Sequence, residues 1–157
     1  MSGKKHYQQG ESGSSFTYPM QVANVKQNDY AILKGFPCLV TEITTGKGGK
    51  CGHIKAYIIG IDIFTGKKYE ELCPILHNIE IPFVKKYELQ LIGISDDDYL
   101  TLLIENGEIK EDIKLPDDEP QLVEKLKADF DNQKDIIVSI IQAMGQEKVI
   151  SYREIVN

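Results

Sequence analysis

The sequence predicts a mainly β protein built from two modules. Short runs of β-branched and apolar residues recur along the chain, which is typical of strands. Tight-turn signals such as Asn106-Gly107 separate several of these runs. Charge divides the chain as well: residues 1–83 hold nine basic and seven acidic residues, a net +2, whereas residues 84–157 hold nine basic and seventeen acidic residues, a net −8. We therefore place a boundary at Pro82.

Composition limits the classes of protein to consider. A chain of 157 residues with 41% hydrophobic content is long enough for one globular domain or two small ones. Its longest apolar runs are far too short to span a membrane, and no apolar segment follows the basic N-terminus as in a secretory signal. Three separated cysteines, Cys38, Cys51 and Cys73, argue against a disulfide framework. We expect a cytoplasmic protein with no membrane partner.

The first half reads as a polar tail followed by a β domain. Residues 1–15 are rich in Gly, Ser and Gln, and we expect them to be disordered. The first domain is placed at residues 16–82. Its expected strands are residues 20–25, 30–33, 38–44, 54–64, 67–72 and 79–82.

The second half, residues 83–157, has a different order of elements. Its expected strands are residues 87–94, 99–104, 108–115, 136–143 and 149–152. Between the third and the fourth, acidic residues and Pro120 precede Leu122, Leu126 and Phe130 at helical spacing, which predicts one helix over residues 118–132. Three strands, a helix and two strands match the OB-fold, a partly open five-stranded barrel used for nucleic acids.

The most unusual segment is residues 45–55, which holds four glycines, three lysines and no acidic residue. Because both flanks read as strands, we interpret it as the tip of a long β-hairpin. Glycine lets the backbone adopt positive φ and lets another molecule approach closely. The tip therefore presents Lys50 with little side-chain bulk around it. From composition alone, a solvated tip with incidental lysines and a cationic finger for nucleic acid both remain open.

The sequence gives less support to a catalytic site or a metal site. The segment lacks the G-x-x-x-x-G-K-[ST] pattern and precedes a strand, so it is not a phosphate-binding P-loop. Cys51 with His53, and Cys73 with His77, have ligand chemistry but not the spacing of a zinc finger. A buried Cys73 and a His77 hydrogen-bonded in a turn are the preferred interpretation. Nothing accompanies Cys51 and His53 that indicates an oxyanion hole, so we expect no enzyme.

Several segments together carry a family resemblance. They are Lys47, Gly49, Lys50, Gly52, His53 and Lys55 in the glycine-lysine segment, and residues 18–21, 33–38, 60–70, 73–78 and 91–94 elsewhere. This pattern resembles the eukaryotic translation initiation factor 5A family, which is related to bacterial elongation factor P. The similarity covers about residues 16–145 and is highly specific.

The resemblance implies an N-terminal SH3-like β-barrel followed by the C-terminal OB-fold barrel with one helix. It also implies that Lys50 becomes hypusine. Deoxyhypusine synthase moves a 4-aminobutyl group from spermidine onto the lysine amine, and deoxyhypusine hydroxylase then adds one oxygen. No dissociable cofactor is implied. Small neighbours such as Gly48, Gly49 and Gly52 suit the entry of Lys50 into a deep enzyme pocket.

The implied function is in translation. Such a factor binds the ribosome beside peptidyl-tRNA, and its modified lysine contacts the tRNA acceptor end. By positioning that end it promotes peptide-bond formation at stalling, proline-rich sequences and peptide release. The residues expected to support modification and tRNA contact are Lys47, Gly48, Gly49, Cys51, Gly52, His53 and Lys55. Further RNA contacts are expected from Lys34, Lys67, Lys68, Lys85 and Lys86. With Lys47 and Lys55 they would form a basic stripe. A solvated hairpin end explains Lys67-Lys68 equally well.

Two residues depart from the family pattern. Cys51 stands where the family usually has histidine, and Gly48 stands where it often has a hydroxyl residue. Cys51 removes a hydrogen-bond donor and adds a thiol open to oxidation. The alternative function is a general RNA-binding adaptor whose working surface is the OB-fold rather than the loop. A metal- or thiol-dependent enzyme using Cys51 and His53 is the third hypothesis.

Overall fold

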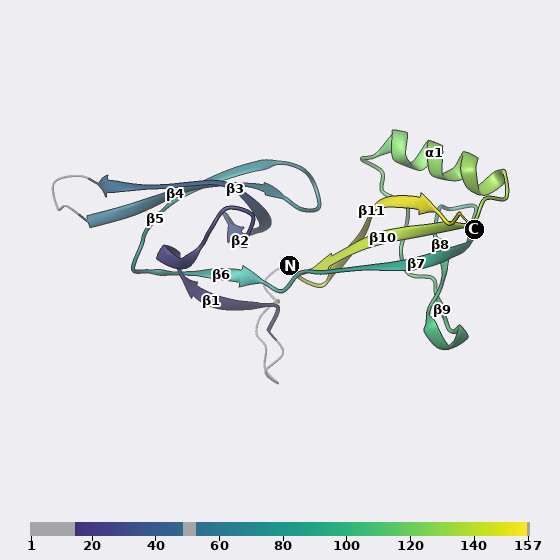
Figure 1. Ribbon diagram of the computed structural model, residues 1–157, viewed down its shortest axis with the longest axis horizontal. Helices are drawn as coiled ribbons and strands as arrows, with labels where there is room; N and C mark the ends of the chain where they lie inside the picture. The colour runs from purple at the N-terminus through teal and green to yellow at the C-terminus, as the bar shows by residue number, and fades with distance from the viewer. Residues whose placement is uncertain (1–14, 49–52, 157) are drawn as a thin grey trace. The chain divides into compact units, whose positions relative to one another are not determined.

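The structure is a computed structural model that describes residues 15–48 and 53–156. Figure 1 shows antiparallel strands with one α-helix. The strands of the first half are β1 (Thr17–Gln21), β2 (Tyr30–Leu33), β3 (Phe36–Gly48), β4 (His53–Asp62), β5 (Lys68–Pro74) and β6 (Asn78–Pro82). The elements of the second half are β7 (Lys85–Ile94), β8 (Leu100–Leu103), β9 (Ile109–Lys110), α1 (Pro120–Asp131), β10 (Ile136–Ala143) and β11 (Gln146–Glu154).

The chain forms two compact units. The first ends at Val84 and also takes in Ala143–Gly145, and the second begins at Lys85. Each unit has its own cluster of buried apolar residues. Within the described residues, no helix is long and apolar enough to cross a membrane.

The first unit combines a four-stranded sheet, in the order β2-β3-β4-β5, with the β1-β6 pair. Leu33, Val40 and Ile58 are fully buried in its core. Gly60 in β4 allows the strands to pack closely, because a Cβ there would lie only 2.8 Å from Leu33 Cδ1 and 2.9 Å from Cys38 Cβ. Gly60 is thus needed for the close packing of β4 against Leu33 and Cys38.

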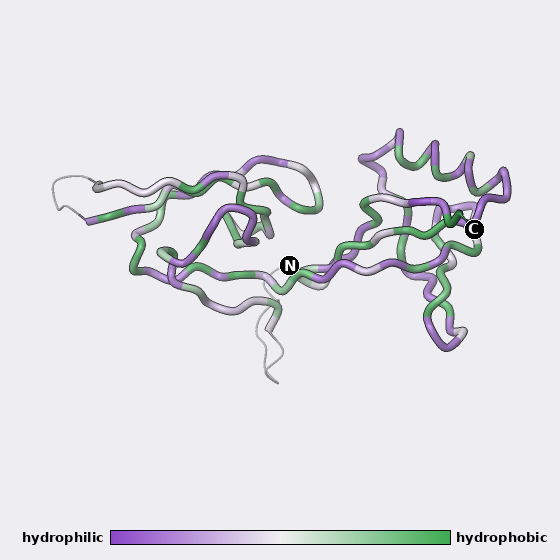
Figure 2. Tube along the Cα trace, in the orientation of Figure 1, coloured by the Kyte–Doolittle hydropathy of each residue, from purple (hydrophilic) through white to green (hydrophobic). Residues whose placement is uncertain are grey.

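The second unit is a five-stranded sheet in the order β11-β10-β7-β8-β9, with α1 packed against it through the fully buried Leu126. The helix begins with Pro120 at its first turn, where the missing N–H costs nothing. Green and purple alternate along α1 in Figure 2, as expected for an amphipathic helix. The predicted two-domain β fold with one helix is confirmed.

Two predicted strands were wrong. In place of the strand over residues 20–25, β1 ends at Gln21 and Val22–Asn24 forms a 3-10 helix. There the Val22 N–H donates to the His77 carbonyl, and the Val25 N–H donates back to Val22. A sequence pattern cannot reveal that long-range bond.

The second wrong strand is residues 108–115, of which only Ile109–Lys110 form β9. Beyond Lys110 the chain leaves the ladder and returns at an isolated bridge between Tyr99 and Lys114. This path buries Ile113 and Leu115 in the core of the second unit. Burial of these two apolar residues accounts for the alternation that resembled a strand.

Candidate functional site

The first unit carries a long two-stranded ribbon made of β3 and β4 (Figure 1). The two strands are paired from Cys38 opposite Asp62 to Gly48 opposite His53. The register shifts at a bulge after Val40. β5 accompanies β4 only as far as Lys55, which lies opposite Pro74. The last pairs of the ribbon therefore have no third strand beside them.

The core of the unit stops before the ribbon ends. Ala56 and Ile58 in β4 are fully buried, and Ile43 in β3 packs partly against the core. Thr44 and His53, nearer the tip, are exposed. The final part of the ribbon is thus held by its backbone ladder rather than by burial, so its outer residues are available to another molecule.

The predicted loop residues divide into two groups. Gly49, Lys50, Cys51 and Gly52 lie outside the described residues. Lys47 and Gly48 are the last two residues of β3, and they pair with Ile54 and His53. Lys55 is half-buried and pairs with Gly46 on one side and Pro74 on the other.

Lys67 and Lys68 lie at the other end of the sheet. Lys68 pairs with Ile61, six residues along β4 from Lys55, a separation of about 20 Å at the usual rise of a strand. Acidic Glu70 lies between, and its carboxylate forms an ion pair with Lys68 at 3.3 Å. Lys67 and Lys68 therefore do not continue the group at Lys55 as a single basic stripe would require.

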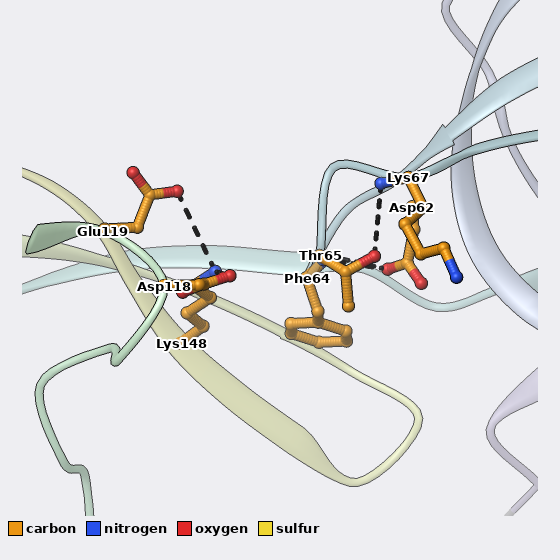
Figure 3. Close-up of polar contacts among 7 residues, drawn as sticks. All are labelled: Asp62, Phe64, Thr65, Lys67, Asp118, Glu119 and Lys148. Atoms are coloured by element: carbon orange, nitrogen blue, oxygen red, sulfur yellow. Dashed lines mark hydrogen bonds and ion pairs between the residues drawn. The ribbon is translucent and has the colours of Figure 1, made fainter.

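The turn that carries Lys67 is built around a buried carboxylate, as the close-up in Figure 3 shows. Asp62 Oδ1 accepts hydrogen bonds from the backbone N–H of Phe64 at 2.8 Å and of Thr65 at 3.3 Å. Gly66 has a φ of 78°, which completes the tight turn predicted from the sequence. Lys67 Nζ lies 5.9 Å from the centre of the Tyr69 ring, within reach of a cation–π interaction.

The other lysines predicted to contact RNA lie in different parts of the structure. Lys34 has a φ of 53° in the turn before β3, and its backbone N–H donates to Glu71 Oε1 at 2.9 Å. Lys85 and Lys86 begin β7 in the second unit, where both are exposed. Lys85 Nζ lies 5.1 Å from the centre of the Tyr87 ring.

Two exposed residues of the four-stranded sheet were missed by the sequence reasoning. Tyr57 and Leu72 lie opposite each other on the outer face of β4 and β5, with 38% and 59% of their surface exposed. The Tyr57 hydroxyl donates to the Glu70 carboxylate, and this bond raises the pKa of Tyr57. Alternation along each strand was the signal for this face, because buried Ala56 and Cys73 alternate with them.

The described cysteines do not form a nucleophilic or metal centre. Cys38 and Cys73 are buried, which confirms the preferred interpretation of Cys73 as a core residue. Burial raises the pKa of Cys38 to about 11 and, with the nearby Glu71 carboxylate, also raises that of Cys73. The His77 backbone N–H donates to the Pro74 carbonyl at 3.1 Å in a turn. In residues 15–48 and 53–156, no group of three His, Cys, Asp or Glu side chains is arranged to hold a metal.

Family models cover both units. Residues 15–77 match the model described as "Translation initiation factor 5A-like, N-terminal". Residues 83–153 match the model described as "Eukaryotic elongation factor 5A hypusine, DNA-binding OB fold". The two matches together span most of the chain.

Individual relatives agree with the family models. The chain is 48% identical over 143 residues to eukaryotic translation initiation factor 5A of Drosophila melanogaster, covering 91% of this chain and 89% of the relative. It is 46% identical over 155 residues to factor 5A-2 of Saccharomyces cerevisiae, covering 98% and 97%.

Solved structures show the same likeness. A translation initiation factor eIF-5A family protein from Naegleria fowleri superposes with a TM-score of 0.85 at 46% identity, covering 88% of this chain and 99% of that one. Factor 5A from Methanococcus jannaschii superposes with a TM-score of 0.64 at 27% identity, covering 89% and 96%. From the matched domains, the near-complete coverage and the shared fold, it follows that this chain belongs to the eukaryotic translation initiation factor 5A family.

Proposed function

We propose that this translation factor acts on the ribosome through a hypusine side chain at Lys50. In this proposal, deoxyhypusine synthase transfers the 4-aminobutyl group of spermidine to the Lys50 amine, and the rest of spermidine leaves as 1,3-diaminopropane with the proton that the amine loses. Deoxyhypusine hydroxylase then converts one C–H of the new chain to C–OH, with molecular oxygen as the oxidant and a reductant that takes up its second oxygen atom. The modified factor then binds beside peptidyl-tRNA, where it favours peptide-bond formation at proline-rich sequences and peptide release. The factor itself catalyses no covalent step.

The observation that carries the proposal is the ribbon of β3 and β4. Its ladder runs to the pair of Gly48 and His53, so residues 49–52 join two strands that are hydrogen-bonded up to their ends. Residues Thr44–Gly46 of β3 and His53 of β4 are exposed, so core packing does not occupy this end of the unit. The proposal requires that Lys50 reach first a modifying enzyme and then RNA.

The modification would suit the proposed task physically. An aminobutyl extension lengthens the side chain and adds a second basic nitrogen, which together match the phosphates and hydroxyls of a tRNA acceptor end. Holding that end in a reactive geometry contributes through orientation rather than through proton transfer. Three residues at or beside the end of the ribbon are proposed to support this contact: Lys47, His53 and Lys55.

The first measurement is the mass of the protein purified from its native cell, with fragmentation across residues 45–55. The expected result is one aminobutyl group on Lys50, with the added oxygen reporting hydroxylation. The functional test compares Lys50→Arg with Lys26→Arg in a reconstituted translation assay of a tri-proline message. Lys26 is exposed and belongs to neither β3 nor β4, so its variant controls for a lysine-to-arginine change.

Lys50→Arg should abolish the stimulation of tri-proline synthesis, because arginine keeps the charge but cannot accept the aminobutyl group. Lys26→Arg should retain it. Full activity of Lys50→Arg, or an unmodified Lys50 in the native protein, would contradict the proposal. Salt-sensitive binding of free single-stranded RNA by the unmodified protein would then favour an adaptor that works through its OB-fold.

A further inference from the structure

The first unit also contains a cavity that is not lined by residues of β3 or β4. Its volume is about 430 Å³, within the size range of small-ligand sites. It lies between β1, the turn before β2, and the end of β6. The lining residues that matter chemically are Tyr18, Asp29, Tyr30, Pro82 and Phe83.

Aromatic rings form one wall of the cavity. The rings of Tyr18 and Phe83 contact each other with centroids 5.0 Å apart and planes tilted by 42°. Their exposed fractions are 38% and 57%, so neither ring is part of the buried core. Tyr30, half-buried, contributes a third aromatic side chain. Ring faces carry negative electrostatic potential and attract organic cations.

A single charged residue, Asp29, lines the cavity among the described residues. Its Oδ2 accepts the Lys26 backbone N–H at 2.9 Å, and its own N–H donates to the Lys26 carbonyl at 3.1 Å. The Val40 N–H donates to the Asp29 carbonyl at 2.8 Å, which ties this turn to β3. The carboxylate is thus held in place, and no described residue donates to its Oδ1.

We propose that this cavity binds the cationic side chain of an arginine or a lysine from a protein partner. The carboxylate Oδ1 of Asp29 would accept hydrogen bonds from the guanidinium or ammonium group, and the rings of Tyr18 and Phe83 would cover the alkyl stem and the charge. Pro82 supplies apolar surface for the stem. An anion is disfavoured by the negative charge of Asp29.

The site is distinct from the proposed modification at Lys50. None of its lining residues belongs to β3 or β4. Binding of a cationic side chain in this cavity is therefore independent of the function proposed for the ribbon.

The test is a titration of the full-length protein, monitored through the backbone amide signals of its NMR spectrum. The probes are N-acetyl-arginine methylamide, N-acetyl-lysine methylamide and the neutral, similarly long N-acetyl-norleucine methylamide. We expect saturable shifts at Tyr18, Asp29 and Phe83 with the two cationic probes and none with norleucine. A stronger response to arginine would identify the guanidinium as the preferred group, because it also stacks on rings.

Two variants locate the interaction. Asp29→Asn keeps the shape of the carboxylate but removes its charge, and we expect it to weaken binding of the arginine probe about fivefold. Phe83→Leu removes one ring at an exposed position, and we expect a similar, about fivefold, loss. The matched controls in the second unit are Asp96→Asn and Tyr99→Leu, two exposed residues that should leave binding unchanged.

The amide spectrum of each variant also shows whether its fold is intact. Equal shifts with norleucine, an absence of saturable shifts with both cationic probes, or unchanged affinity in a folded Asp29→Asn protein would overturn the proposal.

Discussion

Tyrosine hydroxyls bonded to carboxylates recur across the sheets of both units. Tyr57 donates to Glu70 in the first unit, and Tyr87 donates to Glu147 in the second. Tyr152 in β11 donates to Asp129 Oδ2 in α1 at 2.7 Å, so this bond joins the helix to the sheet. Partial burial, followed by this bond to Asp129, raises the pKa of Tyr152 to about 12. These contacts make stability at alkaline pH sensitive to individual hydroxyls.

Tyr152→Phe tests that sensitivity. Because the pKa of Tyr152 in the folded protein lies above its ordinary value of 10.0, its contribution to stability is full below pH 10.0 and is lost as pH rises through about 12. We expect the urea midpoint of the wild-type protein to fall more steeply over this range than that of Tyr152→Phe. Tyr99→Phe serves as the control, because the Tyr99 hydroxyl forms no hydrogen bond with a described residue. Parallel pH curves for the wild-type and Tyr152→Phe proteins would contradict the prediction.

At the scale of elements, α1 packs on the core of the second unit through an apolar face, with Leu126 fully buried and Val123 and Phe130 partly buried. Its N-cap residue, Glu119, forms no side-chain capping bond to the helix. Instead, Lys148 of β11 lies 2.9 Å from Asp118 Oδ2 and 4.0 Å from Glu119 Oε2, on the approach to the helix (Figure 3). Leu126 is the helical residue that is fully buried in the core of the second unit. We therefore expect the burial of Leu126 to contribute strongly to holding the helix on the sheet.

Truncating Leu126 should expose this dependence. Leu126→Ala removes a buried side chain and leaves a cavity, so we expect the free energy of unfolding to fall by about 3 kcal/mol. Lys125→Ala, an exposed neighbour on the same helix, should change it by less than about 0.5 kcal/mol. Urea denaturation followed by circular dichroism measures both. Similar losses in the two variants would show that helix propensity, rather than packing, holds α1.

At the scale of the whole molecule, the two cores share no residue. The buried cluster of the first unit ends at Ile81, and that of the second begins at Leu91. Residues 85–157 contain all five strands of their sheet together with α1. Residues 85–157 thus hold the whole core of the second unit, together with Ala143–Gly145, which belong to the first unit.

A fragment of residues 85–157 should therefore fold alone. We expect its amide spectrum to be well dispersed, with core amides such as those of Leu102 and Val138 close to their positions in the full-length protein. Differences should concentrate near Gly145, where a Cβ would meet the Phe16 ring at 3.4 Å in the complete chain. A collapsed, poorly dispersed spectrum would mean that the second core needs the first unit.

Much of the fold was predictable because strands, turns and the helix leave local signals. Both residues of Asn106-Gly107 have φ near 80°, at 81° and 82°, as the turn pattern predicted. The helix spans Pro120–Asp131, within the predicted residues 118–132. The errors at residues 20–25 and 108–115 arose where a distant partner, such as His77 for Val22, changed the path of the chain. Local propensity does not contain such partners.

The sequence alone determined the family, the order of strands and helix, and the glycine-lysine segment that the ribbon carries. These depend on residue type and spacing, which are local properties of the chain. The tertiary structure decided that Lys67 and Lys68 lie about 20 Å along the sheet from Lys55. It also decided that Tyr18, Asp29 and Phe83 line one cavity. Both outcomes follow from strand register, which is set by the simultaneous packing of residues far apart in the chain.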